Sequence, residues 1–210
     1  SVNSAGVSAR PLFATVLAVL FLGEAASLTT AAGVLVLVVG LGALALAKGG
    51  DIGGWEPYEL LFPVGAAICF AVGNVLRRHG LTSSDVSSLE AVALNEVAAL
   101  LVLLGYAVAR GRLGEIRDAP RETWGYFAGS GTITAVALLS LFAAFGHPEG
   151  TVAVVDPLAA TAPLFTTVFA YFLLGDLERV TRGVVLGAAM IVLGVTLVTA
   201  GPALLGTLGL

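Results

Sequence analysis

Two stretches of this sequence are nearly the same: RPLFATVLAVLFLGE at residues 10–24 and APLFTTVFAYFLLGD at residues 162–176. When Pro11 is placed on Pro163, an offset of 152, eight of the fourteen positions that follow the first letter are identical. The last of these positions is a glutamate in the first copy and an aspartate in the second. The match therefore covers an apolar segment together with the Leu-Gly-acid corner that ends it.

The likeness continues beyond the corner. After two extra residues in the second copy, each copy has a pair of glycines seven residues apart. A shared apolar composition does not by itself align prolines, corners and glycines together, so we predict an internal repeat. We assign structural roles to its marker residues, which are Pro11, Gly23, Glu24, Gly33 and Gly40 in the first copy and Pro163, Gly175, Asp176, Gly187 and Gly194 in the second.

The composition places the repeat in a membrane. Hydrophobic residues make up 58% of the chain and charged residues 11%, whereas soluble domains average about 25% charged residues. The mean hydropathy is +0.99, and no basic surface of the kind that binds nucleic acid is visible. Because backbone groups in hydrocarbon must be satisfied within the segment, we predict an all-α, polytopic transmembrane helix bundle in contact with the lipid bilayer.

Seven apolar segments are long enough to cross a bilayer, which takes roughly 20 residues. The repeat starts on the first and again on the sixth segment, five crossings later. An odd number of crossings makes the two copies face opposite ways, so we predict an inverted repeat, an architecture found in many secondary transporters. The predicted spans are Val2–Leu22, Thr29–Ala47, Leu60–Leu76, Val86–Ala109, Trp124–Phe145, Thr151–Leu174 and Val180–Ala200.

The motif P-L-F-x-x-x-x-A-x-x-x-L-G-[ED], followed by a helix with glycines seven apart, resembles the closing helix pair of a repeat in the drug/metabolite transporter superfamily, EamA type. The segment PVGAAICFAVGNVLRRHG resembles the helix that opens such a repeat. The resemblance implies two five-helix repeats. Residues 1–47 would be the last two helices of an N-terminally truncated first repeat, 48–59 an inter-repeat loop, 60–200 a complete second repeat and 201–210 a tail.

Membrane orientation is left open by two opposing indications. The connectors on one face carry two arginines, Arg77 and Arg78, and those on the other face carry seven basic residues. The positive-inside rule makes the second face cytoplasmic, whereas the family's usual arrangement would place the first face inside.

Two ionisable residues, Arg10 and Glu96, fall near the middle of predicted spans, where a charge costs at least ~2.5–3.5 kcal/mol. Arg10 could attract an anionic substrate or pair with Glu96, or it could lie at an interface with its head group in water. Glu96 follows Asn95, and burial favours the protonated form of a carboxylate, which suits a proton carrier. The alternative is a buried glutamate that hydrogen-bonds a neighbouring helix.

Asp156 precedes Pro157 in the sixth span. Aspartate at an N-cap followed by proline is an ordinary helix start, and we prefer this interpretation. Alternatively the helix begins near Thr151 and Asp156 faces a cavity at an irregular point. Thr161 could line a pathway, although threonine also bonds back to its own helix, and Asn74 is assigned to the headgroup region.

These features predict a secondary transporter of small metabolites, by resemblance amino acids, related metabolites or toxic compounds, with protons as the coupling ion. The pathway candidates are Arg10, Asn95, Glu96, Asp156 and Thr161. A membrane scaffold or remnant is the alternative, and a membrane enzyme is disfavoured because no catalytic motif is visible. We expect no cofactor, no metal and no nucleic-acid partner, a homodimer as one option for assembly, and a multi-pass location in a prokaryotic cell membrane.

Overall fold

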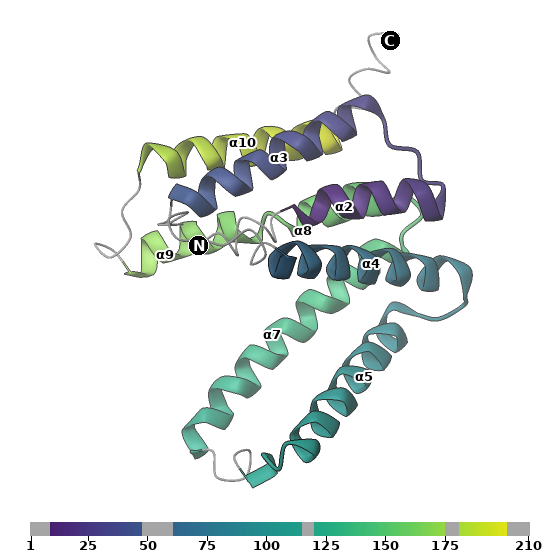
Figure 1. Ribbon diagram of the computed structural model, residues 1–210, viewed down its shortest axis with the longest axis vertical. Helices are drawn as coiled ribbons and strands as arrows, with labels where there is room; N and C mark the ends of the chain where they lie inside the picture. The colour runs from purple at the N-terminus through teal and green to yellow at the C-terminus, as the bar shows by residue number, and fades with distance from the viewer. Residues whose placement is uncertain (1–8, 48–60, 115–119, 175–180, 201–210) are drawn as a thin grey trace. The chain divides into compact units, whose positions relative to one another are not determined.

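The computed structural model describes residues 9–47, 61–114, 120–174 and 181–200, and every regular element in these ranges is a helix (Figure 1). Six helical segments are long and apolar enough to cross a membrane, and Arg10–Leu22 is a shorter apolar one. The all-α prediction is therefore confirmed. The predicted loop at 48–59, the tail at 201–210, and Gly175 and Asp176 lie outside the described residues.

The helix bounds follow the predicted spans closely, apart from the end of the third span and a break in the sixth. Helix α4 runs to Ser83, beyond the predicted end at Leu76, so the RRHGLTS sequence continues the helix and does not form a turn. Hydropathy missed this extension because the added residues are polar, and polar residues can remain helical outside hydrocarbon. The elements are α2 (Arg10–Leu17), η1 (Ala18–Leu22), α3 (Leu28–Ala47), α4 (Leu61–Ser83), α5 (Ser88–Ala109), α7 (Arg121–Gly146), α8 (Val152–Ala159), α9 (Ala162–Leu174) and α10 (Arg182–Thr199).

The chain divides into two compact units, one made of Ser1–Arg77 with Glu149–Leu210 and one made of Arg78–Pro148. In the first unit, α3 and α10 lie side by side along most of their length (Figure 1). They run antiparallel, because Gly33 faces Gly194 whereas Gly40 faces Gly187. In the sequence match Gly187 corresponds to Gly33 and Gly194 to Gly40. Gly33 therefore faces the counterpart of Gly40, and Gly40 faces the counterpart of Gly33.

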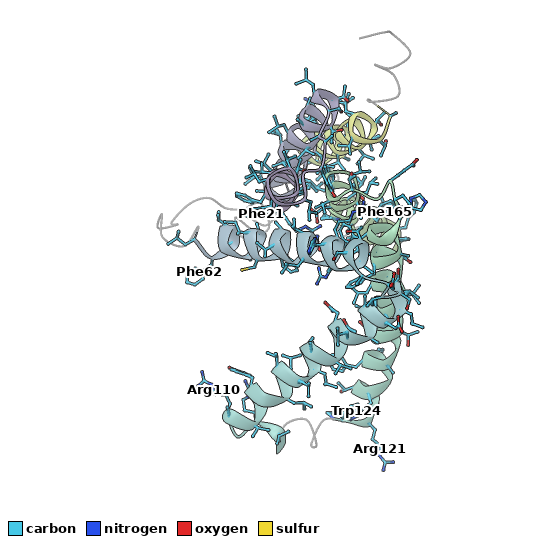
Figure 2. The ribbon with its side chains drawn as sticks, turned by 90° about the vertical axis from the view of Figure 1, so that its right-hand side faces the viewer. Phe21, Phe62, Arg110, Arg121, Trp124 and Phe165 are labelled. Atoms are coloured by element: carbon cyan, nitrogen blue, oxygen red, sulfur yellow. The ribbon has the colours of Figure 1, made fainter. Side chains whose placement is uncertain are left out.

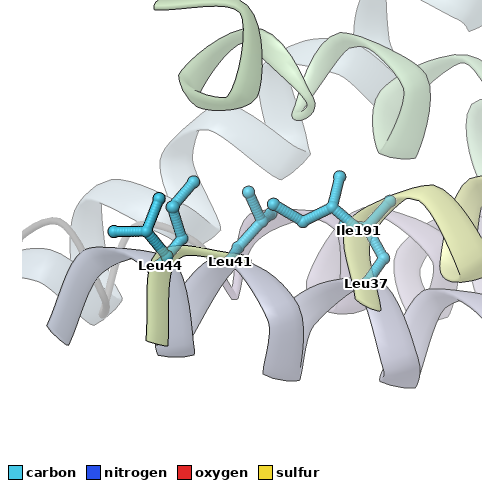
Figure 3. Close-up of a cluster of buried hydrophobic side chains, with 5 residues drawn as sticks. Leu37, Leu41, Leu44 and Ile191 are labelled. Atoms are coloured by element: carbon cyan, nitrogen blue, oxygen red, sulfur yellow. The ribbon is translucent and has the colours of Figure 1, made fainter. Parts of the chain in front are cut away.

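Glycine at these positions lets the two backbones touch. A Cβ atom added at Gly194 would lie 2.6 Å from the backbone nitrogen of Leu37 and 2.7 Å from the carbonyl oxygen of Gly33. Close approach of this kind is typical of small residues between transmembrane helices. Beside the glycines, a cluster of buried apolar side chains fills the remaining space, formed by Leu37, Leu41, Leu44, Val184 and Ile191 (Figure 3).

The second unit contains a helical hairpin of α5 and α7. Helix α5 begins with a capping box, in which Ser87 and Glu90 satisfy each other's backbone N–H groups. At the other end of the hairpin, Arg110 follows the last residue of α5, and Arg121 and Trp124 lie in the first turn of α7 (Figure 2). Arginine and tryptophan at a helix end are typical of the headgroup region of a bilayer, and the exposed apolar side chains between the two ends suit hydrocarbon.

Candidate functional site

The first unit contains a buried charged group, the carboxylate of Asp156 on α8, whose side chain is 0% exposed. The Nε atom of Arg10 lies 3.3 Å from its Oδ1 atom and donates a hydrogen bond of 3.4 Å to Oδ2. The side-chain amide of Asn74 donates to Oδ1 from α4. Residues from three helices thus converge on one carboxylate, as expected where a buried charge must be paired and hydrogen-bonded.

Asn74 is itself oriented by a second arginine. The Nη1 atom of Arg77 donates a 2.6 Å hydrogen bond to the amide oxygen of Asn74, which leaves the amide N–H₂ group to face Asp156. Two guanidinium groups and one amide therefore surround a single carboxylate. We refer to Arg10, Asn74, Arg77 and Asp156 as the Asp156 cluster.

The assignment of Asn74 to the headgroup region missed its contact with Asp156, because Asn74 is buried in the protein. The sequence holds a signal that could have found it. Pro63, Ala67, Ala71 and Asn74 recur at helical spacing and all are buried, so Asn74 continues a stripe of small residues that faces the protein.

The preferred interpretation of Asp156 as an N-cap was wrong. Helix α8 begins at Val152, Thr151 is its N-cap residue, and Asp156 and Pro157 lie inside the helix. Asp156 is therefore free to point its carboxylate at Arg10 and Asn74. The alternative start near Thr151 is the one that the structure shows.

A carboxylate from another part of the chain makes this helix start possible. Glu24 accepts hydrogen bonds from the backbone N–H of Val152, at 3.1 Å to Oε1, and of Ala153, at 3.3 Å to Oε2. An acidic side chain at a helix N-terminus satisfies free N–H groups and interacts favourably with the helix dipole. Glu24 is thus a cap residue, but the helix it caps is 128 residues away in sequence.

The corner that carries Glu24 depends on Gly23. This glycine has a φ of +64°, in the left-handed region, and it ends the π-helical stretch η1. Glycine adopts that conformation without steric cost. The Leu-Gly-acid motif therefore turns the chain at the glycine and places the acid against α8.

Arg10 is the second residue of the cluster that the sequence singled out. It is the first residue of α2, directly before Pro11, and its side chain is 21% exposed. The structure pairs Arg10 with Asp156, whereas the sequence suggested Glu96 as its carboxylate partner. Its guanidinium also lies over the ring of Phe70, 5.9 Å from the centroid, within the range of a cation–π contact.

The sixth predicted span is interrupted just after the cluster. Helix α8 ends at Ala159 and α9 begins at Ala162, with a turn between them. Thr161 lies at this break, and its hydroxyl donates a 2.7 Å hydrogen bond to the carbonyl oxygen of Leu158. Pro163, the second residue of α9, favours this interruption, because it has no N–H to donate to the carbonyl oxygen of Ala159 and its ring crowds that group.

A family model for the EamA-like transporter family matches residues 57–200. The chain belongs to the EamA-like transporter family. The match contains α4 through α10, and it therefore includes Asn74, Arg77 and Asp156 of the cluster. A search of curated proteins gave no match.

Family membership and the six apolar helices together make this EamA protein a multi-pass integral membrane protein and a transporter of the drug/metabolite type. Asn74 and Arg77 of the Asp156 cluster lie on one of these six apolar helices and Asp156 lies on another. Intramembrane charges are rare and mark substrate or ion pathways, and broken helices are common at transporter binding sites.

The other two pathway candidates lie in the second unit of the EamA protein. Asn95 and Glu96 are neighbours on α5, and the amide of Asn95 donates a 3.0 Å hydrogen bond to Oε1 of Glu96. Glu96 is exposed. Of the two carboxylates among the pathway candidates, Asp156 is thus enclosed by arginine and amide groups and Glu96 is exposed.

Within the ranges that the structure describes, no group of three or more His, Cys, Asp and Glu side chains lies close enough to hold an ion. The same ranges contain no buried side-chain nitrogen or oxygen without a hydrogen-bond partner.

Proposed function

We propose that this EamA protein is a secondary transporter that moves a small metabolite across a prokaryotic cell membrane by alternating access. The observation that carries the proposal is the Asp156 cluster, a fully buried carboxylate held by Arg10 and Asn74 beside a helix break. A charge in hydrocarbon is costly, so a purely structural bundle gains little from keeping one there. The family resemblance points to amino acids, related metabolites or toxic compounds as substrates.

The contact between α3 and α10 supports the alternating-access part of the proposal. Gly33 faces Gly194 and Gly40 faces Gly187, and exchange of the two sequence copies converts one pair into the other. This crosswise pairing is what a two-fold relation between inverted repeats would produce. In transporters of that design one repeat moves against the other around a central site.

We further propose that transport is coupled to protons, with Glu96 as the carrier. Its position within an apolar helix supports this role, because ionisable side chains within membrane-spanning helices are rare and include the proton relays of pumps and transporters. In the full-length protein, Glu96→Gln should abolish pH-driven uptake into proteoliposomes and leave the protein folded. Glu122→Gln, at the exposed start of α7, is the matched control, and unchanged pH-driven flux in Glu96→Gln would reject Glu96 as the carrier.

Water access distinguishes a transporter from a membrane scaffold. Cys69 is the one native cysteine and is exposed, so it is first replaced by alanine. Single cysteines are then placed at positions 10, 96, 156 and 161 in the full-length protein and treated with a small, polar thiol reagent. A transport pathway predicts modification at these positions, and a scaffold predicts protection at all four, because the reagent does not enter lipid or a closed protein core.

A further inference from the structure

Arg10 uses only part of its hydrogen-bonding capacity in the ion pair with Asp156. The bond is donated by Nε, and both oxygens of the carboxylate lie 3.3–3.4 Å from that one atom. Charge-assisted hydrogen bonds of good geometry are shorter, about 2.7–2.9 Å. A guanidinium has five N–H donors, and among the described residues the four on the two Nη atoms of Arg10 donate no hydrogen bond.

The two members of this pair differ in how firmly they are held. Asp156 is enclosed, and besides Arg10 it has a second donor, the Asn74 amide, which Arg77 orients. Arg10 begins its helix, is partly exposed, and lies over the apolar ring of Phe70. Of the two, the guanidinium is therefore the group that can turn to another partner.

The elements packed around Asp156 bring few other charges. Helix α3 contains no charged residue, α10 has only Arg182 at its first position, and Glu24 is engaged at the N-terminus of α8. Two arginines, Arg10 and Arg77, thus surround one carboxylate. An anion that entered beside Arg10 would compete with the Asp156 carboxylate for the guanidinium.

We infer that Arg10 binds the anionic group of the transported molecule, and that Asp156 is the internal anion that this group replaces. The inference rests on the proposed transport function and names its substrate class: small molecules with a carboxylate or a phosphate. Either group presents paired oxygens that match the two Nη atoms of a guanidinium. The displaced carboxylate of Asp156 remains bound to Asn74, so it is not left without a donor.

The inference is tested by ligand binding to the full-length protein in lipid nanodiscs, measured as stabilisation against heat. The probes are the protein amino acids with their C-terminal amides, and glucose 6-phosphate with glucose. Each pair differs in the anionic group, and the two sets separate carboxylate from phosphate recognition. We expect stabilisation by the member of at least one pair that carries the anionic group, and none by the partner that lacks it.

Variants then assign the binding to Arg10. Arg10→Gln should remove the stabilisation, and Arg10→Lys, which keeps the charge but not the paired donors, should retain part of it. Asp156→Asn should lower the apparent Kd about tenfold or more, because it removes the internal competitor for the guanidinium. Arg110→Gln is the matched control, since Arg110 also lies over an aromatic ring, that of Tyr106, but at the end of α5.

The inference would be overturned by equal binding of the acids and of the partners that lack the anionic group, by unchanged affinity in Arg10→Gln, or by no tighter binding in Asp156→Asn. If Arg10→Gln does not fold, Asp156→Asn and Arg10→Lys decide the question. Stabilisation by no anion also overturns it. In each of these cases, flux of a neutral compound into proteoliposomes would still support the transporter proposal. Absence of any flux would contradict both the transporter proposal and the inference about Arg10.

Discussion

The contact between α3 and α10 can be tested by adding a single methyl group. In Gly194→Ala the new Cβ would lie 2.6 Å from the backbone nitrogen of Leu37, and an ordinary contact begins at 3.4 Å. The helices must therefore separate locally by about 0.8 Å, the difference between these distances, because backbone atoms cannot rotate away. Overpacking of this kind costs typically ~1–3 kcal/mol.

The same substitution also has a favourable effect, because alanine is the better helix former by about 1 kcal/mol. Gly42→Ala isolates that effect. Gly42 lies on α3, two residues from Gly40, and nothing lies within 4 Å of a Cβ added there. The difference between Gly194→Ala and Gly42→Ala in the free energy of unfolding is therefore the packing cost, ~1–3 kcal/mol.

The measurement is unfolding of the full-length protein in mixed micelles by increasing amounts of SDS, followed by circular dichroism. We expect Gly194→Ala to unfold at a lower SDS fraction than the wild type, and Gly42→Ala at the same or a higher one. The double variant Gly33→Ala/Gly194→Ala should be less destabilised than the sum of its parts, because one separation of the helices accommodates both methyl groups. Equal stability of Gly194→Ala and Gly42→Ala would refute the close contact.

Two further predictions concern helix ends. Glu24→Ala should destabilise the protein by ~0.5–2 kcal/mol, because two N–H groups of α8 lose their acceptor. Glu24→Gln should cost less, since one amide oxygen remains. SDS unfolding measures both variants, and a wild-type midpoint for Glu24→Ala would show that the cap does not contribute to stability. Arg78 donates to the carbonyl oxygens of Phe145, His147 and Pro148 at the end of α7. Arg78→Ala should therefore increase the rate of amide hydrogen exchange near His147. Arg78→Lys should give an intermediate rate, because a lysine cannot contact all three oxygens in a fixed geometry. An unchanged exchange rate in Arg78→Ala would count against this cap.

Local chemistry in the sequence determined the helices and their approximate ends. Each apolar run had to become a helix, because hydrocarbon offers no partner for a free backbone group. The glycine spacing, the corner at Gly23 and the choice of Arg10 and Asp156 as candidate residues also came from the sequence, since each depends on residue type and on near neighbours. The family motif rests on the same local features.

Only the tertiary structure decided which residues meet. Asp156 and Pro157 have the local pattern of a helix start, yet α8 begins at Val152 because Glu24, far away in sequence, supplies the acceptors for its first N–H groups. Asn74 looked like an interfacial residue until α4 placed it against Asp156. Caps and ion pairs of this kind depend on how helices pack, and packing is a property of whole surfaces that no short stretch of sequence specifies.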